Sequence, residues 1–239
     1  MRHQRSAARR LSRGLSIVEL LVGMTIGLFI LTGSSALFVA NIASSRRLAL
    51  ETRINQDLRT TMELMTRDLR RGAYWGNALA GTLPHDDTGV APSNPYAVIK
   101  LTPTTEPKQI LYSYTRDPTE NSRLDNNEVF GFRLTAGAIQ MCFGGGSAAT
   151  CNNWQTLSNT DILTISEFSL TPNQTEIDLR AACANSCIDT ALAPACPRVE
   201  VRSYTISLTG SAISDPALSR TLRSQVRVRN DALLGSCPL

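Results

Sequence analysis

A glycine and a glutamate near the N-terminus carry the first chemistry that the sequence suggests. Gly14 ends a basic leader (residues 1–14), and an almost wholly apolar run follows over residues 15–43, with Glu19 as its only charge. A secretory signal peptide would place its cleavage site after a shorter apolar core. Here the processing signal precedes the apolar run, so we expect a peptidase to remove the leader and leave the apolar segment in place.

Residues 15–43 are long enough to cross a membrane as a helix. About 20 apolar residues span the hydrocarbon core of a bilayer. Gly23 and Gly27 form a pattern that either allows helices to pack closely or reflects the tolerance of membrane helices for glycine. The leader contains arginines and no acidic residue. Positive charge favours the cytoplasmic side, so we expect the C-terminal part to be exported.

Glu19 favours a functional interpretation. A carboxylate at the centre of a bilayer costs about 2.5–3.5 kcal/mol on insertion scales. Near the helix end its side chain could reach the membrane interface without a partner. The alternative is that another charge meets it, and cleavage after Gly14 would create an α-amine on Leu15, about one helical turn away.

Residues 44–72 read as an amphipathic continuation of the helix. Its apolar residues recur three or four positions apart, on one face: Leu50, Ile54, Leu58, Met62, Met65 and Leu69. The stripe is too short for the sustained heptads of a coiled coil, so we expect it to pack on the protein's own sheet. Arg70 and Arg71 followed by Gly72 predict the helix end, with glycine as the left-handed cap.

Residues 73–239 are expected to form one β-rich globular domain, which makes the fold α+β with an antiparallel sheet. The alternating segments 130–134 and 139–143 predict a hairpin. Further strands are expected at 97–101, 109–115, 162–170, 198–208 and 222–228. In the segment 198–208 the apolar phase changes between Val201 and Tyr204, which predicts a β-bulge near Arg202 and Ser203.

Six cysteines lie beyond the apolar segment, and an even number in an exported domain indicates disulfides. Cys142 and Cys151 flank a glycine-rich loop and are expected to form a local bridge. The other four should form two more, with three arrangements open: Cys183, Cys187, Cys196 and Cys237. The same four could bind zinc, but they lack the paired spacing of common zinc sites.

Little in the sequence supports catalysis, a cofactor or a resident metal. His85 is the single histidine after the leader, and no nucleophile-elbow motif accompanies it. The oxygen-rich segment 125–128 lacks the spacing of a calcium loop, and the glycines at 144–146 lack the lysine of a phosphate-binding loop. We therefore expect turns at both places and no enzyme activity.

The net charge of +4 does not indicate a nucleic-acid partner. Five arginines lie in the leader, and without them the formal charge falls to −1: Arg2, Arg5, Arg9, Arg10 and Arg13. Arginines also alternate with apolar residues in the segment 222–229, as they would on a half-exposed strand. We expect no nucleic acid to bind.

In the order and spacing of Gly14, Leu15 and Glu19, the N-terminus resembles the type IV pilin family, which includes the pseudopilins of type II secretion. Leu15 stands where that family most often has phenylalanine. Two further segments, 68–74 and 228–230, resemble the PilW-type minor pilins and the J-type pseudopilins. The resemblance implies cleavage after Gly14 by a prepilin peptidase, N-methylation of Leu15, and an assembly role for Glu19.

The resemblance also implies a function and a location. We expect a minor pilin that primes or caps a type IV pilus, since the globular part is larger than most major pilins need. Its partners would be other minor pilins, the major pilin and a tip adhesin. It would sit in the inner membrane with a periplasmic domain, or at the pilus tip. The alternatives are a type II pseudopilin and a membrane-tethered periplasmic adhesin or enzyme.

Processing at Gly14 is directly testable. Mass spectrometry of the membrane form should find a mature N-terminus at Leu15. Replacing Gly14 with a bulky residue should leave the precursor uncut, because the peptidase site needs a small residue there. A wild-type protein that retains residues 1–14 would contradict the prediction.

Overall fold

The structure is a computed structural model, and it describes residues 16–81, 93–102, 108–147, 150–188, 196–235 and 237. The chain forms two compact units, residues 1–49 and residues 50–239. The expected cleavage site at Gly14 and Leu15 lies outside the described residues, as does His85.

In the first unit, the described residues form the beginning of helix α1 (Ile17–Leu69). This part of α1 is long and apolar enough to cross a membrane, and its large apolar side chains are exposed. The polar segment 32–35 does not interrupt it. The Thr32 hydroxyl donates to the Leu28 carbonyl and the Ser35 hydroxyl to the Leu31 carbonyl, so both are satisfied within the helix.

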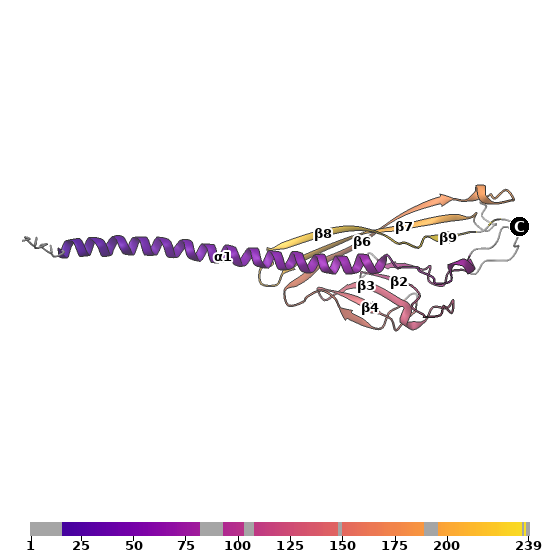
Figure 1. The fold of residues 1–239 in the computed structure, drawn as a ribbon, viewed down its shortest axis with the longest axis horizontal. Coiled ribbons are helices and arrows are strands. Elements are labelled where there is room, and N and C mark those ends of the chain that lie inside the picture. The colour runs from indigo at the N-terminus through magenta and orange to yellow at the C-terminus, as the bar shows by residue number, and fades with distance from the viewer. Residues whose placement is uncertain are drawn as a thin grey trace, which may run out of the picture. The chain divides into compact units, whose positions relative to one another are not determined.

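The second unit contains two antiparallel sheets (Figure 1). The first has five strands in chain order: β1 (Lys100–Thr102), β2 (Gln109–Ser113), β3 (Val129–Thr135), β4 (Ala138–Phe143) and β5 (Trp154–Thr156). The second has the order β6 (Leu163–Asp178), β7 (Arg198–Ala212), β8 (Ser219–Arg227), with β9 (Ala232–Leu234) paired to β7. Three 3-10 helices lie within the described part of the chain: η1 (Ala78–Gly81), η2 (Asn126–Glu128) and η3 (Arg180–Ala182). The predicted α+β class is confirmed.

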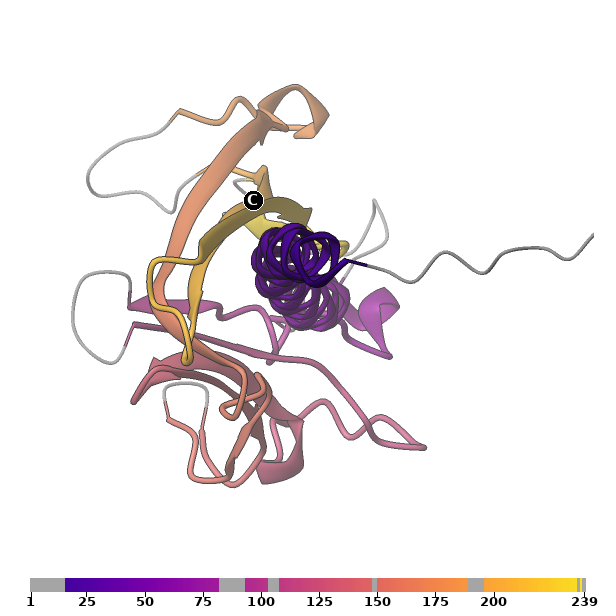
Figure 2. The same cartoon turned by 90° about the vertical axis from the view of Figure 1, so that its left-hand side faces the viewer.

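The predicted apolar stripe of residues 50–69 joins the two sheets into one core. Ile54, Leu58, Met65 and Leu69 are fully buried, and Met62 is nearly so. They pack with Ile110 and Phe132 of the first sheet and with Phe168, Ile206 and Leu208 of the second. In Figure 2 the domain part of α1, residues 50–69, lies beside strands of both sheets. Each buried side chain contributes about 1.5–3 kcal/mol.

The predicted hairpin is present as β3 and β4. Its two turn residues, Ala136 and Gly137, have φ of 49° and 74°. Two positive φ values are typical of the type I′ turn, whose twist matches that of the flanking strands. The pairing places Phe132 opposite Met141.

The expected bulge at Arg202 and Ser203 is wrong. β7 alternates between faces without interruption from Arg202 to Ala212, and the register shift lies on its neighbour β6, between Ile165 and Glu167. The change of phase arises because Arg202 occupies a position on the inner face. Its guanidinium donates to the carbonyls of Ala97 and Asn230, at 2.5 and 3.0 Å, which allows burial of an arginine there.

The expected cap at Gly72 is also wrong in its conformation. The left-handed residue is Ala73, with φ of 61°. Its amide donates to the Ser113 carbonyl of β2 at 2.7 Å, so a tertiary contact sets this turn. Gly72 has no positive φ; a Cβ there would lie 3.1 Å from the Leu69 carbonyl oxygen.

Several strands differ from their predicted extents. β6 continues through residues 171–178, which are exposed and mostly polar, because it pairs with β7 as far as Asp178–Arg198. The short strands β5 and β9 were not expected, and β1 begins at Lys100 rather than at residue 97. Exposed or very short strands lack the apolar alternation on which the prediction depends.

All cysteines form disulfides: Cys142–Cys151, Cys183–Cys237 and Cys187–Cys196. This selects one of the three arrangements that were open for the last four. The Cys183–Cys237 bridge joins the segment after η3 to the C-terminal region, 54 residues apart. The four thiols that were considered as zinc ligands are therefore in two of these bridges.

The disulfides should differ in their effect on stability. Loop-closure entropy predicts a loss of about 4 kcal/mol when the Cys183–Cys237 bridge is removed, and about 3 kcal/mol for Cys142–Cys151, which spans nine residues. Denaturant unfolding of the full chain in detergent, with each pair replaced by serine, measures both. A larger loss for the short bridge would contradict the entropic explanation.

Candidate functional site

Two regions, one in each unit, place charged side chains beside apolar surface. The first is the N-terminal turn of α1. Glu19 lies in the first turn of the helix and is exposed, and no ion pair within the described residues involves it. A carboxylate is favourable at a helix N-terminus, where backbone amides point outward. A Cβ added to Gly23 or Gly27 would have no atom within 4 Å, so this surface is open to a neighbouring helix.

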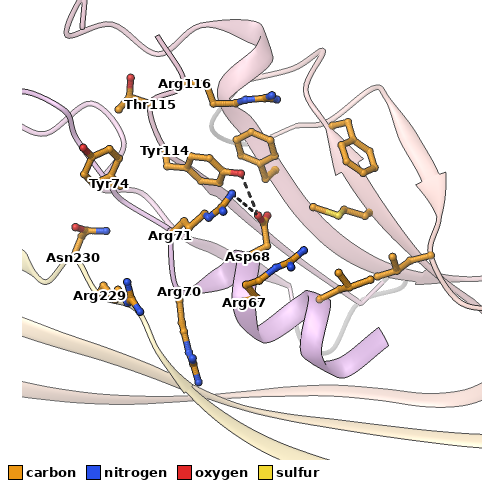
Figure 3. A pocket seen from close by; sticks show the side chains of 15 residues that line it. Arg67, Asp68, Arg70, Arg71, Tyr74, Tyr114, Thr115, Arg116, Arg229 and Asn230 are labelled. Carbon is orange, nitrogen blue, oxygen red and sulfur yellow. Dashed lines mark hydrogen bonds and ion pairs between the residues drawn. The ribbon is translucent and has the colours of Figure 1, made fainter. Parts of the chain in front are cut away.

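The second region is a hollow of about 960 Å³ in the domain, where α1 ends (Figure 3). We call it the arginine hollow. Its polar lining comes from three places in the chain: the end of α1 and the following turn, the segment after β2, and the segment after β8. The lining residues are Leu64, Arg67, Asp68, Arg70, Arg71, Tyr74, Tyr114, Thr115, Arg116, Phe130, Met141, Phe143, Leu157, Arg229 and Asn230.

Asp68 is the single acidic residue of this lining, and it is largely buried. It accepts hydrogen bonds from the Tyr112 hydroxyl at 2.5 Å and from the Tyr114 hydroxyl at 3.1 Å. Arg71 adds an ion pair at 3.9 Å, which Figure 3 shows beside the Tyr114 bond. Hydrogen bonds to a charged group contribute about 1.5–3 kcal/mol each. Asp68 thus fixes the end of α1 to the first sheet.

The surroundings of Tyr112 and Tyr114 raise the pKa of both hydroxyl groups. Burial, and after it the charge of the nearby Asp68 carboxylate, raises the pKa of Tyr114 to about 12. Burial also raises the pKa of Tyr112, again with Asp68 as the next cause. Both hydroxyls therefore stay protonated at neutral pH and donate to Asp68.

The remaining lining has two kinds of side chain. Exposed arginines give it positive charge, and apolar groups form the rest of the wall. The Tyr114 and Phe130 rings stack at 4.1 Å, and the Arg116 guanidinium lies 5.7 Å from the Phe130 ring centroid. The hollow thus offers cations beside an aromatic surface.

Of the two places where turns were expected, the oxygen-rich segment forms the 3-10 helix η2 and the glycine-rich segment forms a loop. Asp125 caps η2, and the buried Glu128 carboxylate accepts hydrogen bonds from the amides of Arg116 and Asp125. Gly144 and Gly145 have positive φ in the loop that Cys142–Cys151 closes. Within the part of the chain that the structure describes, no three His, Cys, Asp or Glu side chains form a group that could hold a metal.

The arginine hollow was not anticipated from the sequence. Arg70 and Arg71 were read only as a helix end, and Arg229 only as part of a strand. The excess of arginine at the end of one helix could have indicated a positively charged site. That Arg116 and Arg229 line the same hollow depends on the tertiary fold.

A helix long and apolar enough to cross a membrane, joined in sequence to a disulfide-bonded domain of antiparallel sheets, fits a pilin-like, membrane-anchored protein. A family model described as "Prepilin peptidase-dependent protein B" matches residues 47–228, about three quarters of the chain. The chain belongs to this family. The match covers the domain and not the Gly14–Glu19 motif, so the two indications are independent. No curated protein and no solved structure matches the chain.

The tyrosine network predicts a stability change at alkaline pH. The pKa of Tyr114 in the folded state, about 12, exceeds the value of about 10 for an unfolded tyrosine. Its contribution to stability should therefore be complete below pH 10 and should be lost as the pH rises toward 12. Denaturant unfolding of the full chain between pH 8 and 12 measures this loss.

Absorbance of tyrosinate at 295 nm supplies the control. Compared with the wild type, a Tyr114→Phe variant should show a smaller rise in absorbance only near pH 12, where Tyr114 titrates. Loss of amplitude near pH 10 would show that Tyr114 titrates as an ordinary exposed tyrosine.

Proposed function

We propose that this chain is a minor pilin of the PilW type, which the prepilin peptidase processes and which joins other minor pilins to prime or cap a type IV pilus. The observation that carries the proposal is the conjunction of Glu19 on an exposed apolar helix with a domain of the prepilin peptidase-dependent family. The name of the family supports dependence on that peptidase and partners related to a pilus or pseudopilus.

In this function the role of the chain is structural and not enzymatic. The helix anchors the protein in the inner membrane after cleavage, and the domain lies in the periplasm. The three disulfides support that location, because they form and persist in an oxidising compartment.

Glu19 would then act in assembly. After cleavage, the helix would offer a carboxylate one turn from its start, and a neighbouring pilin would offer the α-amine of its own first residue. An ion pair between them would be strong in lipid, where a single charge is costly. The open surface at Gly23 and Gly27 would allow the two helices to approach.

A pseudopilin of type II secretion is the second candidate. The same N-terminal architecture supports it, because the family that the N-terminus resembles includes pseudopilins as well as pilins. The two candidates differ in what fails when assembly fails: surface pili in one case and the export of folded proteins in the other.

Glu19→Ala tests the assembly role. Membrane insertion should survive, because removal of a charge from a membrane helix makes insertion easier. Pili should fall at least tenfold when the variant is the only copy, while the protein accumulates in the inner membrane. Counting surface pili beside a membrane immunoblot measures both.

Glu63→Ala is the matched control, since Glu63 is an exposed glutamate on the domain part of the same helix. It should leave pilus number unchanged. Normal piliation together with normal type II secretion in Glu19→Ala would show that this carboxylate has no assembly role and only reaches the membrane interface. Normal piliation with a loss of type II secretion would favour the pseudopilin.

A further inference from the structure

The arginine hollow has an excess of positive charge that the domain does not neutralise. Four exposed arginines of its lining make no ion pair within the described part of the chain: Arg67, Arg70, Arg116 and Arg229. The Asp68 carboxylate contacts two tyrosines and Arg71 and forms no ion pair with these four arginines within the described residues. Clustered like charges repel one another, so an external anion would stabilise this arrangement.

The backbone of these arginines is held in place. The Arg229 amide donates to the Arg70 carbonyl at 3.1 Å, and the Arg116 amide donates to the Glu128 carboxylate at 2.8 Å. The Asn230 side chain donates to the Gly72 carbonyl at 3.0 Å. The Thr115 amide also donates to the Tyr74 carbonyl at 3.0 Å, so the segment that carries Arg116 is bound to the turn after α1. Three chain segments distant in sequence are therefore tied together, which lowers the entropic cost of binding at this point.

Another part of the lining is apolar and partly accessible. Leu64, Met141, Phe143 and Leu157 contribute to it, and the side chains of Phe143 and Tyr74 are 40% and 49% exposed. Arginine with exposed aromatic residues is the composition that protein interfaces favour. A phosphate or sulfate ion would engage the arginines and leave this apolar wall uncovered.

We propose that the arginine hollow binds a segment of a neighbouring protein subunit that carries at least two carboxylates beside an apolar side chain. Guanidinium groups hold carboxylates in paired hydrogen bonds, and the apolar wall would hold the adjacent side chain. A volume of about 960 Å³ accommodates several residues. The inference rests on the proposed function only for the source of the segment, a subunit of the same assembly.

Photo-crosslinking in the native host tests the inference with the full chain. Benzoylphenylalanine in place of Phe143 puts a similar aromatic probe in the hollow. Irradiation should give an adduct in the membrane fraction, and mass spectrometry should place the crosslink within a few residues of two or more Asp or Glu residues in another protein.

Charge reversal decides whether the arginines cause the adduct. A double variant, Arg67→Glu with Arg116→Glu, should reduce the adduct at least tenfold. Reversal of the identified acidic residues to lysine should restore it. Arg59→Glu, an exposed arginine of α1 outside the hollow, should leave the yield unchanged. An unchanged denaturant midpoint of the purified double variant in detergent shows that its domain is folded.

Three results would overturn the inference: no adduct, an adduct with a second copy of this chain, or a yield that does not respond to the double reversal. Phosphate supplies a further arm with the purified full chain in detergent. Stabilisation by inorganic phosphate that Arg67→Glu abolishes, together with a crosslink indifferent to charge, would indicate a simple anion site. Adducts are scored in the membrane fraction and not by the number of pili. The crosslinking result can therefore be interpreted even if Glu19→Ala leaves piliation unchanged.

Discussion

The domain depends on the burial of one stripe of apolar side chains on α1. Ile54, Leu58, Met65 and Leu69 have no exposed surface, and each contacts a core to which both sheets contribute. The sheets are separate hydrogen-bonded units, so apolar packing rather than strand pairing holds them together. Without the helix, the inner faces of both would be open to water, at a cost that scales with apolar area.

Asp68 fixes the position of α1 along its axis more precisely than the apolar packing does. An apolar stripe resists translation of the helix weakly, because neighbouring aliphatic groups are similar in shape. A buried carboxylate with two tyrosine donors tolerates far less displacement, since its unmet hydrogen bonds would cost several kcal/mol. The same contact holds the end of α1, with Arg67 and Arg71, against the first sheet, in the hollow that Arg116 also lines. A structural requirement at the helix end therefore also concentrates charge at the surface.

The two units differ in how much apolar surface they expose. The described part of residues 1–49 exposes nearly all of its apolar surface, which is stable only in lipid or against other helices. The domain buries its apolar residues and adds disulfides. The family match falls almost entirely on the domain, whereas the residues that resemble a prepilin cleavage motif lie at positions 14–19. Membership of a pilin-related class is thus supported by two regions with unrelated physical constraints.

The sequence by itself determined the features that arise from local periodicity and composition. The apolar run, the stripe from Leu50 to Leu69, the β3–β4 hairpin and the presence of disulfides all follow from residue spacing over short distances. A helix repeats every 3.6 residues and a strand every two, so these patterns are legible without a partner segment.

Only the tertiary structure decided the features that join distant residues. Arg202 was read as a break in strand phase, but it is a buried residue whose charge is met by the carbonyls of Ala97 and Asn230. The left-handed turn fell on Ala73 because Ser113 supplies a carbonyl there. The disulfide partners of Cys183 and Cys187 and the meeting of Arg70 with Arg229 likewise depend on chain segments that no local pattern connects. The physical reason is that hydrogen bonds, disulfides and charges act over a few ångströms in space, whatever their separation along the chain.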